Sequence, residues 1–228
     1  LAAAPPADLR VMCDAMDFVF QIGLATKGNP AGKWPSKEIT STRAKWRAEV
    51  EAEYAPIPQI ADALRDCLPA GAMIYSDMTQ FAYASKETWD MDQPGHWHHP
   101  NGFGTLGYAL PAAIGGAIAR KGAPTLAIAG DYGFHYTMQE LGVAVELGLP
   151  LPIILWDNAK LGAIEASMVS AQIAPNAVVA RNPDFLKLAE AFGAGAVAPQ
   201  SLDEMQTAVQ AAFTANGPTL IYVTPQIA

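Results

Sequence analysis

Short, uninterrupted apolar runs constrain the fold of this chain more than any other feature. They cover residues 72–75, 125–129, 152–156 and 219–223, and a weaker run covers 194–197. Strands that are buried on both faces, as in parallel sheets, carry continuous rather than alternating apolar residues. Segments with helical periodicity separate the runs. The sequence therefore predicts an α/β fold with a doubly wound, mainly parallel sheet and helices on both faces.

Several expected helices carry boundary signals. Thr137-x-x-Glu140 and Ser201-x-x-Glu204 have the spacing of a capping box, and each precedes apolar residues at helical spacing. Asn182-Pro183 is expected to supply the cap and the first-turn proline of another helix, which should end at Gly193.

The first 55 residues differ from the rest. They predict helices from about Ala7 to Thr26 and from about Thr40 to Tyr54, joined by a Gly/Pro/Lys-rich break at 27–33. The chain begins without an initiator Met or a secretory signal, so it is expected to start within a longer protein. We interpret residues 1–55 as the tail of a preceding domain plus a linker, and 56–228 as a separate domain.

Composition narrows the class of partner and the compartment. With 14 Lys and Arg against 22 Asp and Glu the formal net charge is −8, which disfavours a nucleic-acid partner. Cys13 and Cys67 have neither disulfide nor metal spacing, as expected in the cytoplasm. The apolar stretch Val11–Ala25 contains Asp14 and Asp17 and is too short to span a membrane.

Polar and glycine-rich residues follow three of the expected strands. These segments are 76–80, 130–134 and 157–162, and a further glycine-rich segment, 101–107, opens a helix. In open parallel α/β sheets, ligands bind beyond the carboxyl ends of the strands. The sequence therefore predicts a binding site at that edge.

Asp131 and Asn158 indicate what this edge binds. Each comes just after a strand, and adjacent parallel strands would place them side by side. A carboxylate and an amide oxygen are hard ligands suited to Mg²⁺, which usually also holds phosphates and water. Neighbouring glycines and helix starts favour a bound phosphate. We predict a site in which a metal bridges a diphosphate.

These residues resemble the motif of thiamine-diphosphate-dependent enzymes, which begins with Gly-Asp-Gly and ends in Asn-Asn. Here it runs from Gly130-Asp131 to Asp157-Asn158. The stretch 104–115 is similar to the glycine-rich stretch of acetolactate synthases and benzoylformate decarboxylases, and 77–81 is similar to the diphosphate loop of the former. The resemblance implies the C-terminal cofactor domain, at 56–228, of an enzyme that decarboxylates or ligates 2-oxo acids.

The resemblance also implies roles for individual residues. Mg²⁺ would be bound by the side-chain oxygens of Asp131 and Asn158 and by the carbonyl of Lys160. The Gln80 side chain would hold the diphosphate. It would be joined by the backbone N–H groups around Tyr132, Gly133, Leu161 and Gly162. The Gly104 carbonyl would accept a hydrogen bond from the cofactor's 4′-amino group. Leu106 would lie between its two rings and hold it bent.

Further expectations concern parts that this chain does not supply. In the family the cofactor lies between domains of two subunits, so the resemblance implies a homodimer or homotetramer. The activating glutamate belongs to another domain, so no catalytic residue is expected in this chain.

The chain departs from the family motif at two positions. Tyr132 stands where the second glycine is usual, and Asp157 stands where the first asparagine is usual. The second change adds a negative charge close to a diphosphate unless the side chain points away. The Gly-Asp-Tyr-Gly and Trp-Asp-Asn variants resemble the 5-guanidino-2-oxopentanoate decarboxylases.

Two other classes of protein remain as alternatives. Gly102-x-Gly104-x-x-Gly107 matches the dinucleotide fingerprint of NAD(P) oxidoreductases. That fingerprint requires a strand directly before it, and residues 92–100 are expected to form a loop. The other alternative is a non-catalytic oligomerisation module that keeps the fold.

Some polar residues have simpler interpretations. Asp131 and Asn158 could be turn residues. His96, His98 and His99 lack a fourth ligand, so no zinc site is expected there. Glu165 could face a substrate, although a solvated carboxylate at a helix start is favoured.

Overall fold

The computed structural model describes residues 8–28, 32, 35–91 and 93–228. The chain divides into two compact units, Leu1–Arg43 and Ala44–Ala228. The division falls inside helix α2 (Ser36–Tyr54), whereas the sequence predicts a boundary after residue 55.

Helix α1 (Ala15–Ala25) lies in the first unit and has no buried residue. It begins later than expected because the Asp14 side chain accepts hydrogen bonds from the backbone N–H groups of Met16 and Asp17, at 2.8 and 3.3 Å, and so acts as the N-cap. Ala7 and most of the expected break at 27–33 lie outside the described residues. Helix α2 begins earlier than the expected Thr40. Among the described residues, no helix is long and apolar enough to cross a membrane.

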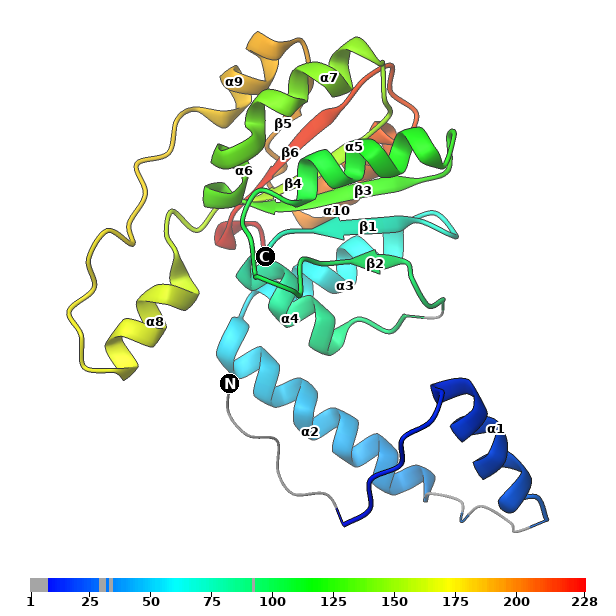
Figure 1. Ribbon diagram of the computed structural model, residues 1–228. Coiled ribbons are helices and arrows are strands. Elements are labelled where there is room, and N and C mark those ends of the chain that lie inside the picture. The colour runs from blue at the N-terminus through cyan, green and yellow to red at the C-terminus, as the bar shows by residue number, and fades with distance from the viewer. Residues whose placement is uncertain (1–7, 29–31, 33–34, 92) are drawn as a thin grey trace. The chain divides into compact units, whose positions relative to one another are not determined.

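A parallel sheet forms the centre of the Ala44–Ala228 unit (Figure 1). Its strands, as far as the chain is described, follow the order β2-β1-β3-β4-β6-β5. They are β1 (Met73–Ser76), β2 (Trp97–His98), β3 (Thr125–Gly130), β4 (Pro152–Trp156), β5 (Gly195–Val197) and β6 (Thr219–Val223). Every pairing is parallel, so the carboxyl ends of the strands meet at one edge.

The apolar runs predicted five of these strands, and β2 was missed. Residues 92–100 were expected to be loop, but Trp97 and His98 pair with Ile74 and Tyr75 of β1. A strand of two residues flanked by histidines and proline has no apolar run to reveal it. Its position is fixed by hydrogen bonding to the edge of the sheet, including Ile74 N–H to the His96 carbonyl at 2.8 Å.

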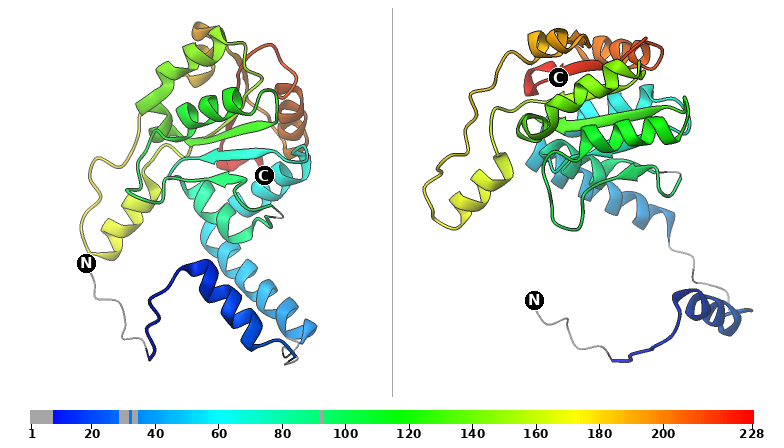
Figure 2. Two further views of the ribbon diagram at one scale, coloured as in Figure 1. Left: turned by 45° about the vertical axis from the view of Figure 1, so that its right-hand side comes forward. Right: turned by 45° about the horizontal axis from the view of Figure 1, so that its top comes forward.

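Helices cover both faces of the sheet, as Figures 1 and 2 show. Alternate β3 residues point to opposite faces: Leu126 and Ile128 pack in one apolar cluster, Ala127 and Ala129 in the other. The first cluster is completed by α3 (Ile57–Cys67), α4 (Gln80–Thr88) and α10 (Leu202–Ala212). The second is completed by α5 (Ala109–Ala119), α6 (Asp131–Thr137), α7 (Leu141–Glu146) and α9 (Phe185–Phe192). The doubly wound α/β fold is thus confirmed.

The predicted helix signals had different outcomes. The Ser201 hydroxyl accepts from the Glu204 N–H at 3.2 Å and caps α10, and Gly193 ends α9 with a φ of 87°. The capping box at Thr137 is wrong. Its hydroxyl donates to the Gly107 carbonyl at 3.1 Å, and a 3₁₀ turn, η1 (Met138–Glu140), follows. The Asn182 cap is also wrong because Asp184 caps α9 by accepting from the Lys187 N–H at 3.1 Å.

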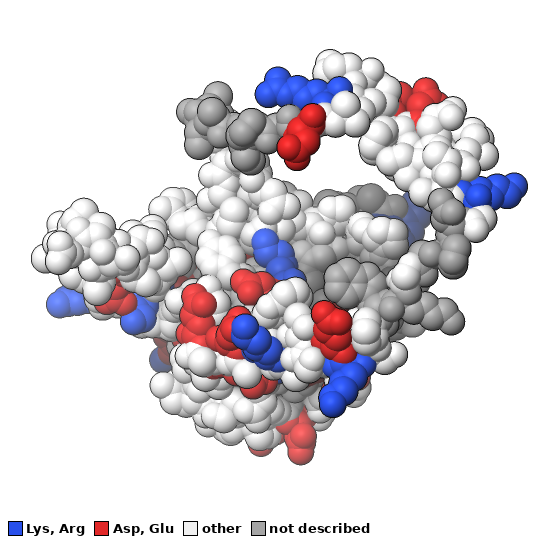
Figure 3. Space-filling model, turned by 90° about the horizontal axis from the view of Figure 1, so that it is seen from below, with Lys and Arg blue, Asp and Glu red and all other residues white. Residues whose placement is uncertain are grey.

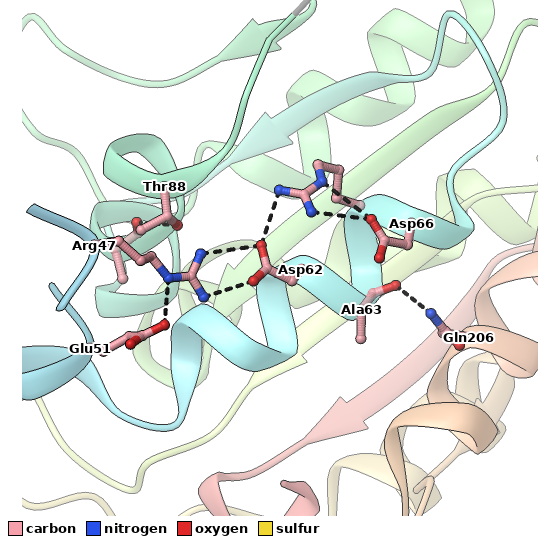
Figure 4. A network of polar contacts seen from close by, with 9 residues as sticks. Arg47, Glu51, Asp62, Ala63, Asp66, Thr88 and Gln206 are labelled. Atoms are coloured by element: carbon pink, nitrogen blue, oxygen red, sulfur yellow. Dashed lines mark hydrogen bonds and ion pairs between the residues drawn. The ribbon is translucent and has the colours of Figure 1, made fainter. Parts of the chain in front are cut away.

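A surface network of ion pairs joins α2 to α3 (Figure 4). Arg47 contacts Glu51 at 2.6 Å and Asp62 at 2.7 Å, and Arg65 contacts the same Asp62 at 3.0 Å. Exposed pairs of this kind contribute only about 0–1 kcal/mol each. Figure 3 likewise shows acidic and basic side chains beside one another on the face that it draws. The network thus links α2 to α3, beside the apolar contact that the buried Val50 of α2 makes with the core.

Candidate functional site

A pocket of about 290 Å³ opens at the carboxyl edge of the sheet, beyond β1, β3 and β4. All ten residues that the sequence predicted for the site line this pocket. They are Gln80, Gly104, Leu106, Asp131, Tyr132, Gly133, Asn158, Lys160, Leu161 and Gly162. The structure therefore brings together residues that lie up to 82 positions apart in the chain.

Strand register explains why these residues meet. Gly130 at the end of β3 pairs with Trp156 at the end of β4, so Asp131 and Asp157 leave the sheet side by side. Asn158 follows one residue later. On the other side of β3, Ser76 of β1 pairs with Ile128, which brings the 77–80 loop to the same edge. Parallel pairing thus places three polar loops around one space.

Gln80, Asn158 and Gly162 form one connected wall of the pocket. The Asn158 side-chain Nδ2 donates to Oε1 of Gln80 at 2.8 Å. A Cβ atom on Gly162 would lie 2.6 Å from that same Oε1. Gly162 also begins α8 (Gly162–Ser170), so its lack of a side chain lets Gln80 lie against the helix start. The amide oxygen of Asn158 accepts from the Lys160 N–H at 3.3 Å.

The buried Asp77 fixes the glycine-rich segment. Its two oxygens accept hydrogen bonds from the N–H groups of Gly107 and Tyr108, both at 3.0 Å. Burial raises the pKa of Asp77, while these backbone donors oppose the rise. A Cβ atom on Gly133 would overlap Oδ2 of Asp77. The residue after Tyr132 must therefore be small, whereas Tyr132 itself lies at the pocket surface.

Asp131 and Asp157 form a buried carboxylate pair, of which only Asp131 lines the pocket; 3% and 7% of their surface is exposed. One amide, that of Asn182, donates to both: to Oδ2 of Asp131 at 2.8 Å and to Oδ1 of Asp157 at 2.9 Å. The Tyr222 hydroxyl donates to the other oxygen of Asp157 at 2.8 Å. Burial raises the pKa of Asp131, and hydrogen bonds from Asn182 and the Tyr132 N–H oppose this.

The Asp157 carboxylate is directed away from the pocket, since it is held by Asn182, Tyr222 and the Ala159 N–H and does not line the cavity. The charge that this departure from the family motif adds is therefore not presented to a ligand. Sequence reasoning missed Asn182 because Asn-Pro before an apolar stripe is typical of a helix start. No local signal relates it to Asp131, which lies 51 residues away.

The three histidines have separate partners. His96 Nδ1 lies 3.2 Å from the Ala72 carbonyl, His98 stacks on Tyr75 with centroids 4.8 Å apart, and His99 Nδ1 lies 2.9 Å from the Ser76 hydroxyl. Among the described residues, no group of three or more His, Cys, Asp or Glu side chains is arranged to bind a metal.

Glu165 pairs with the Lys160 ammonium at 2.7 Å at the rim of the pocket. Trp156 and Phe134 are core residues, with 3% and 1% of their surface exposed.

The donor groups of the pocket fit a hard divalent cation with a phosphate ligand. A carboxylate, an amide and the carbonyl-bearing loop at Lys160 supply oxygens, and Mg²⁺ prefers such ligands together with phosphate and water. Gly133 and Gly162 lack the side chains that would collide with Asp77 or Gln80, so their backbone lies against these residues at the pocket wall. Helix α8 begins at Gly162, and a helix start favours a bound anion. Fold and pocket together define an α/β domain suited to a phosphate-bearing cofactor.

Comparison with known families agrees with this class. Residues 77–223 match the family described as thiamine pyrophosphate enzyme, C-terminal TPP binding domain, and the chain belongs to that family. The comparisons support thiamine diphosphate as the cofactor of this domain and give no support to the NAD(P) oxidoreductase alternative.

Individual relatives share the same domain. The probable 2-ketoarginine decarboxylase AruI of Pseudomonas aeruginosa is 43% identical over 183 residues, which are 78% of this chain and 33% of that protein. The acetolactate synthase isozyme 2 large subunit of Escherichia coli is 30% identical over 180 residues, with the same coverage of 78% and 33%. The chain thus spans about a third of the length of these curated relatives.

A solved structure confirms the fold. The thiamine diphosphate-dependent 4-hydroxybenzoylformate decarboxylase of Rhodococcus jostii RHA1 superposes with a TM-score of 0.69 at 26% identity. The match covers 75% of this chain and 33% of that one.

Proposed function

We propose that this chain holds thiamine diphosphate together with Mg²⁺ in an enzyme that decarboxylates or ligates 2-oxo acids. The observation that carries the proposal is that all ten residues implied by the family resemblance line one pocket at the carboxyl edge of the sheet. Thiamine diphosphate, when bound, supplies the carbanion chemistry of such reactions, and the protein supplies its placement.

The metal is assigned to the Asp131 carboxylate, the Asn158 amide oxygen and the Lys160 carbonyl. These groups come from the loops after β3 and β4, which adjoin through the Gly130–Trp156 pairing. All are hard oxygen donors, and they leave room for phosphate and water, as Mg²⁺ prefers. The absence of any His or Cys from the set favours Mg²⁺ over zinc.

The diphosphate is assigned to backbone N–H groups on both sides of the metal. Those of Tyr132 and Gly133 lie after β3, and those of Leu161 and Gly162 open α8, where the helix start favours an anion. The Gln80 side chain, held by Asn158, adds a donor from its Nε2 group.

The remaining lining residues suit the cofactor's rings. The Gly104 carbonyl is assigned to the 4′-amino group, and Leu106 to the contact between the two rings that keeps the molecule bent. Asp77 orients this segment by binding the N–H groups of Gly107 and Tyr108.

For the substrate, the first candidate is 5-guanidino-2-oxopentanoate, also called 2-ketoarginine, with loss of CO₂. The 43% identity to a probable 2-ketoarginine decarboxylase supports it, and acetolactate synthesis from pyruvate is the second candidate because of the 30% identity to a synthase. We place the activating glutamate outside this domain and expect a homodimer or homotetramer in the cytoplasm. Neither nucleic acid nor a membrane is an expected partner.

The proposal is tested on the full-length protein in two steps. Calorimetry should detect thiamine diphosphate binding with Mg²⁺ and not with EDTA. Release of CO₂ is then measured with 5-guanidino-2-oxopentanoate, pyruvate and other 2-oxo acids. Failure to bind the cofactor in the presence of Mg²⁺, or inertness toward every 2-oxo acid, would overturn the proposal. An oligomer that binds no cofactor would instead indicate the non-catalytic module.

A further inference from the structure

A segment beyond α8 returns to the back of the pocket. In Figures 1 and 2 the chain leaves the sheet at α8 and runs back toward α9. Residues 178–182, here called the return segment, lie antiparallel to the loop that carries Asn158 and Lys160. Leu161 N–H donates to the Val178 carbonyl and Ala180 N–H to the Ala159 carbonyl, both at 2.8 Å. The return segment is thus bound through its backbone to the loop after β4, one of the two loops that carry the proposed metal ligands.

Asn182, the last residue of the return segment, reaches the second of these loops, which follows β3 and carries Asp131. The Nδ2 group donates to Oδ2 of Asp131 at 2.8 Å and to Oδ1 of Asp157 at 2.9 Å, so both amide protons are used. The Asn182 amide oxygen lies 3.2 Å from Nε2 of His135 in α6. A single side chain therefore joins the ends of β3 and β4 and the helix that follows β3.

Burial makes these hydrogen bonds consequential. Asp131 and Asp157 are almost fully buried, and the side-chain partners that hold them, Asn182 and Tyr222, are neutral. Buried carboxylates need hydrogen-bond donors, and bonds to an ionised group are the stronger ones. By binding Oδ2 of Asp131, Asn182 restricts rotation of a carboxylate whose residue lines the pocket.

We propose that Asn182 is a positioning residue for the metal, setting the orientation of Asp131 and the spacing of the β3 and β4 loops before the ion binds. This rests on the proposed Mg²⁺ and thiamine diphosphate site. Outer partners that orient metal ligands typically raise metal affinity about 10- to 100-fold. Asn182 contributes through Asp131 and does not itself touch the metal or the cofactor.

The experiment compares variants of the full-length protein. Asn182→Ala removes the donor, and Asn182→Asp keeps the size of the side chain while placing a third acid between Asp131 and Asp157. Asn176→Ala is the matched control, because Asn176 is exposed on the same stretch of chain. Tyr222→Phe removes a donor from Asp157 alone. Mn²⁺ binding is measured by electron paramagnetic resonance and Mg²⁺-dependent cofactor binding by calorimetry, with thermal unfolding recorded in EDTA.

We expect Asn182→Ala to weaken metal binding about 10- to 100-fold and Asn182→Asp to weaken it further. Asn176→Ala and Tyr222→Phe should bind metal nearly as the unmodified protein does, and excess Mg²⁺ should restore turnover to Asn182→Ala. If both Asn182 variants bind metal normally when folded, even with a lower melting temperature, Asn182 is only structural and the inference is wrong. Absence of metal-dependent binding in the unmodified protein would instead refute the proposed function.

Discussion

The Asp77 carboxylate occupies the space that a side chain on Gly133 would need. The same carboxylate accepts hydrogen bonds from Gly107 and Tyr108, so the loops after β1 and β3 and the glycine-rich segment meet at one buried acid. This explains why the position after Tyr132 requires glycine although Tyr132 itself replaces a glycine of the family motif. The geometry of the pocket depends on this contact.

Gly133→Ala should therefore destabilise the protein and weaken cofactor binding together. The added methyl group would overlap Asp77, and such overpacking costs about 1–3 kcal/mol in the free energy of unfolding. Urea unfolding and calorimetry with thiamine diphosphate measure the two effects. Gly217→Ala is the control, because a Cβ atom there meets nothing within 4 Å. Equal stability of the two variants would contradict the packing argument.

Asp131→Asn should separate metal binding from folding. The substitution removes the only carboxylate assigned to Mg²⁺, so metal affinity should fall by more than the roughly 10- to 100-fold expected for an outer partner. Stability in EDTA should stay the same or rise, because burial already disfavours the charged form of Asp131. Metal titration and thermal unfolding test this. Unaltered Mn²⁺ affinity would remove Asp131 from the metal site.

Gly162→Ala should act through Gln80. A Cβ atom at position 162 would displace the Gln80 side chain, which is flexible, so stability should change little. The Gln80–Asn158 hydrogen bond would be lost, and the apparent KM for thiamine diphosphate should rise about tenfold, worth about 1.4 kcal/mol. The double variant with Gln80→Ala should be no worse than either single change, because contacting residues are not additive. Full additivity would refute the shared mechanism.

His99 should make the protein less stable in acid. Burial and the nearby Lys86 lower the pKa of His99 from 6.5 to about 4. The unfolded chain therefore takes up a proton below about pH 6.5 that the folded protein does not accept until about pH 4. The free energy of unfolding should decrease as the pH falls through this window. Urea titrations of His99→Gln should show a shallower decrease, and an identical pH profile would contradict this.

Removal of the metal should lower the melting temperature of the loaded protein. Ligand at 100 times its Kd stabilises a folded state by about 2.7 kcal/mol. For a chain of this size that corresponds to roughly 5–10 °C. Scanning calorimetry with thiamine diphosphate and Mg²⁺, before and after EDTA, measures the shift. Asp131→Asn should show none of it, and a shift that persists in EDTA would exclude a role for the metal in holding the diphosphate.

Some strands could be predicted from local sequence patterns, whereas others depend on contacts with distant parts of the chain. The runs at 152–156 and 219–223 coincide with β4 and β6, because a strand buried on both faces must be apolar throughout. β2 was missed since its two residues are held by pairing with β1 rather than by any pattern of their own. The helix predicted from about Ala7 runs through Asp14, yet Asp14 is the N-cap at which α1 begins.

The sequence by itself determined five of the six described strands and the loops that reach the carboxyl edge, because periodicity is a property of neighbouring residues. The resemblance of its motifs to a known family supplied the ten residues that line the pocket. Only the tertiary structure decided that Asp157 is directed away from the pocket and that Asn182 bridges two acids instead of capping a helix. The physical reason is that a side-chain amide bonds to whichever buried acceptors the fold brings within about 3 Å, and those acceptors lie 25 and 51 residues away along the chain.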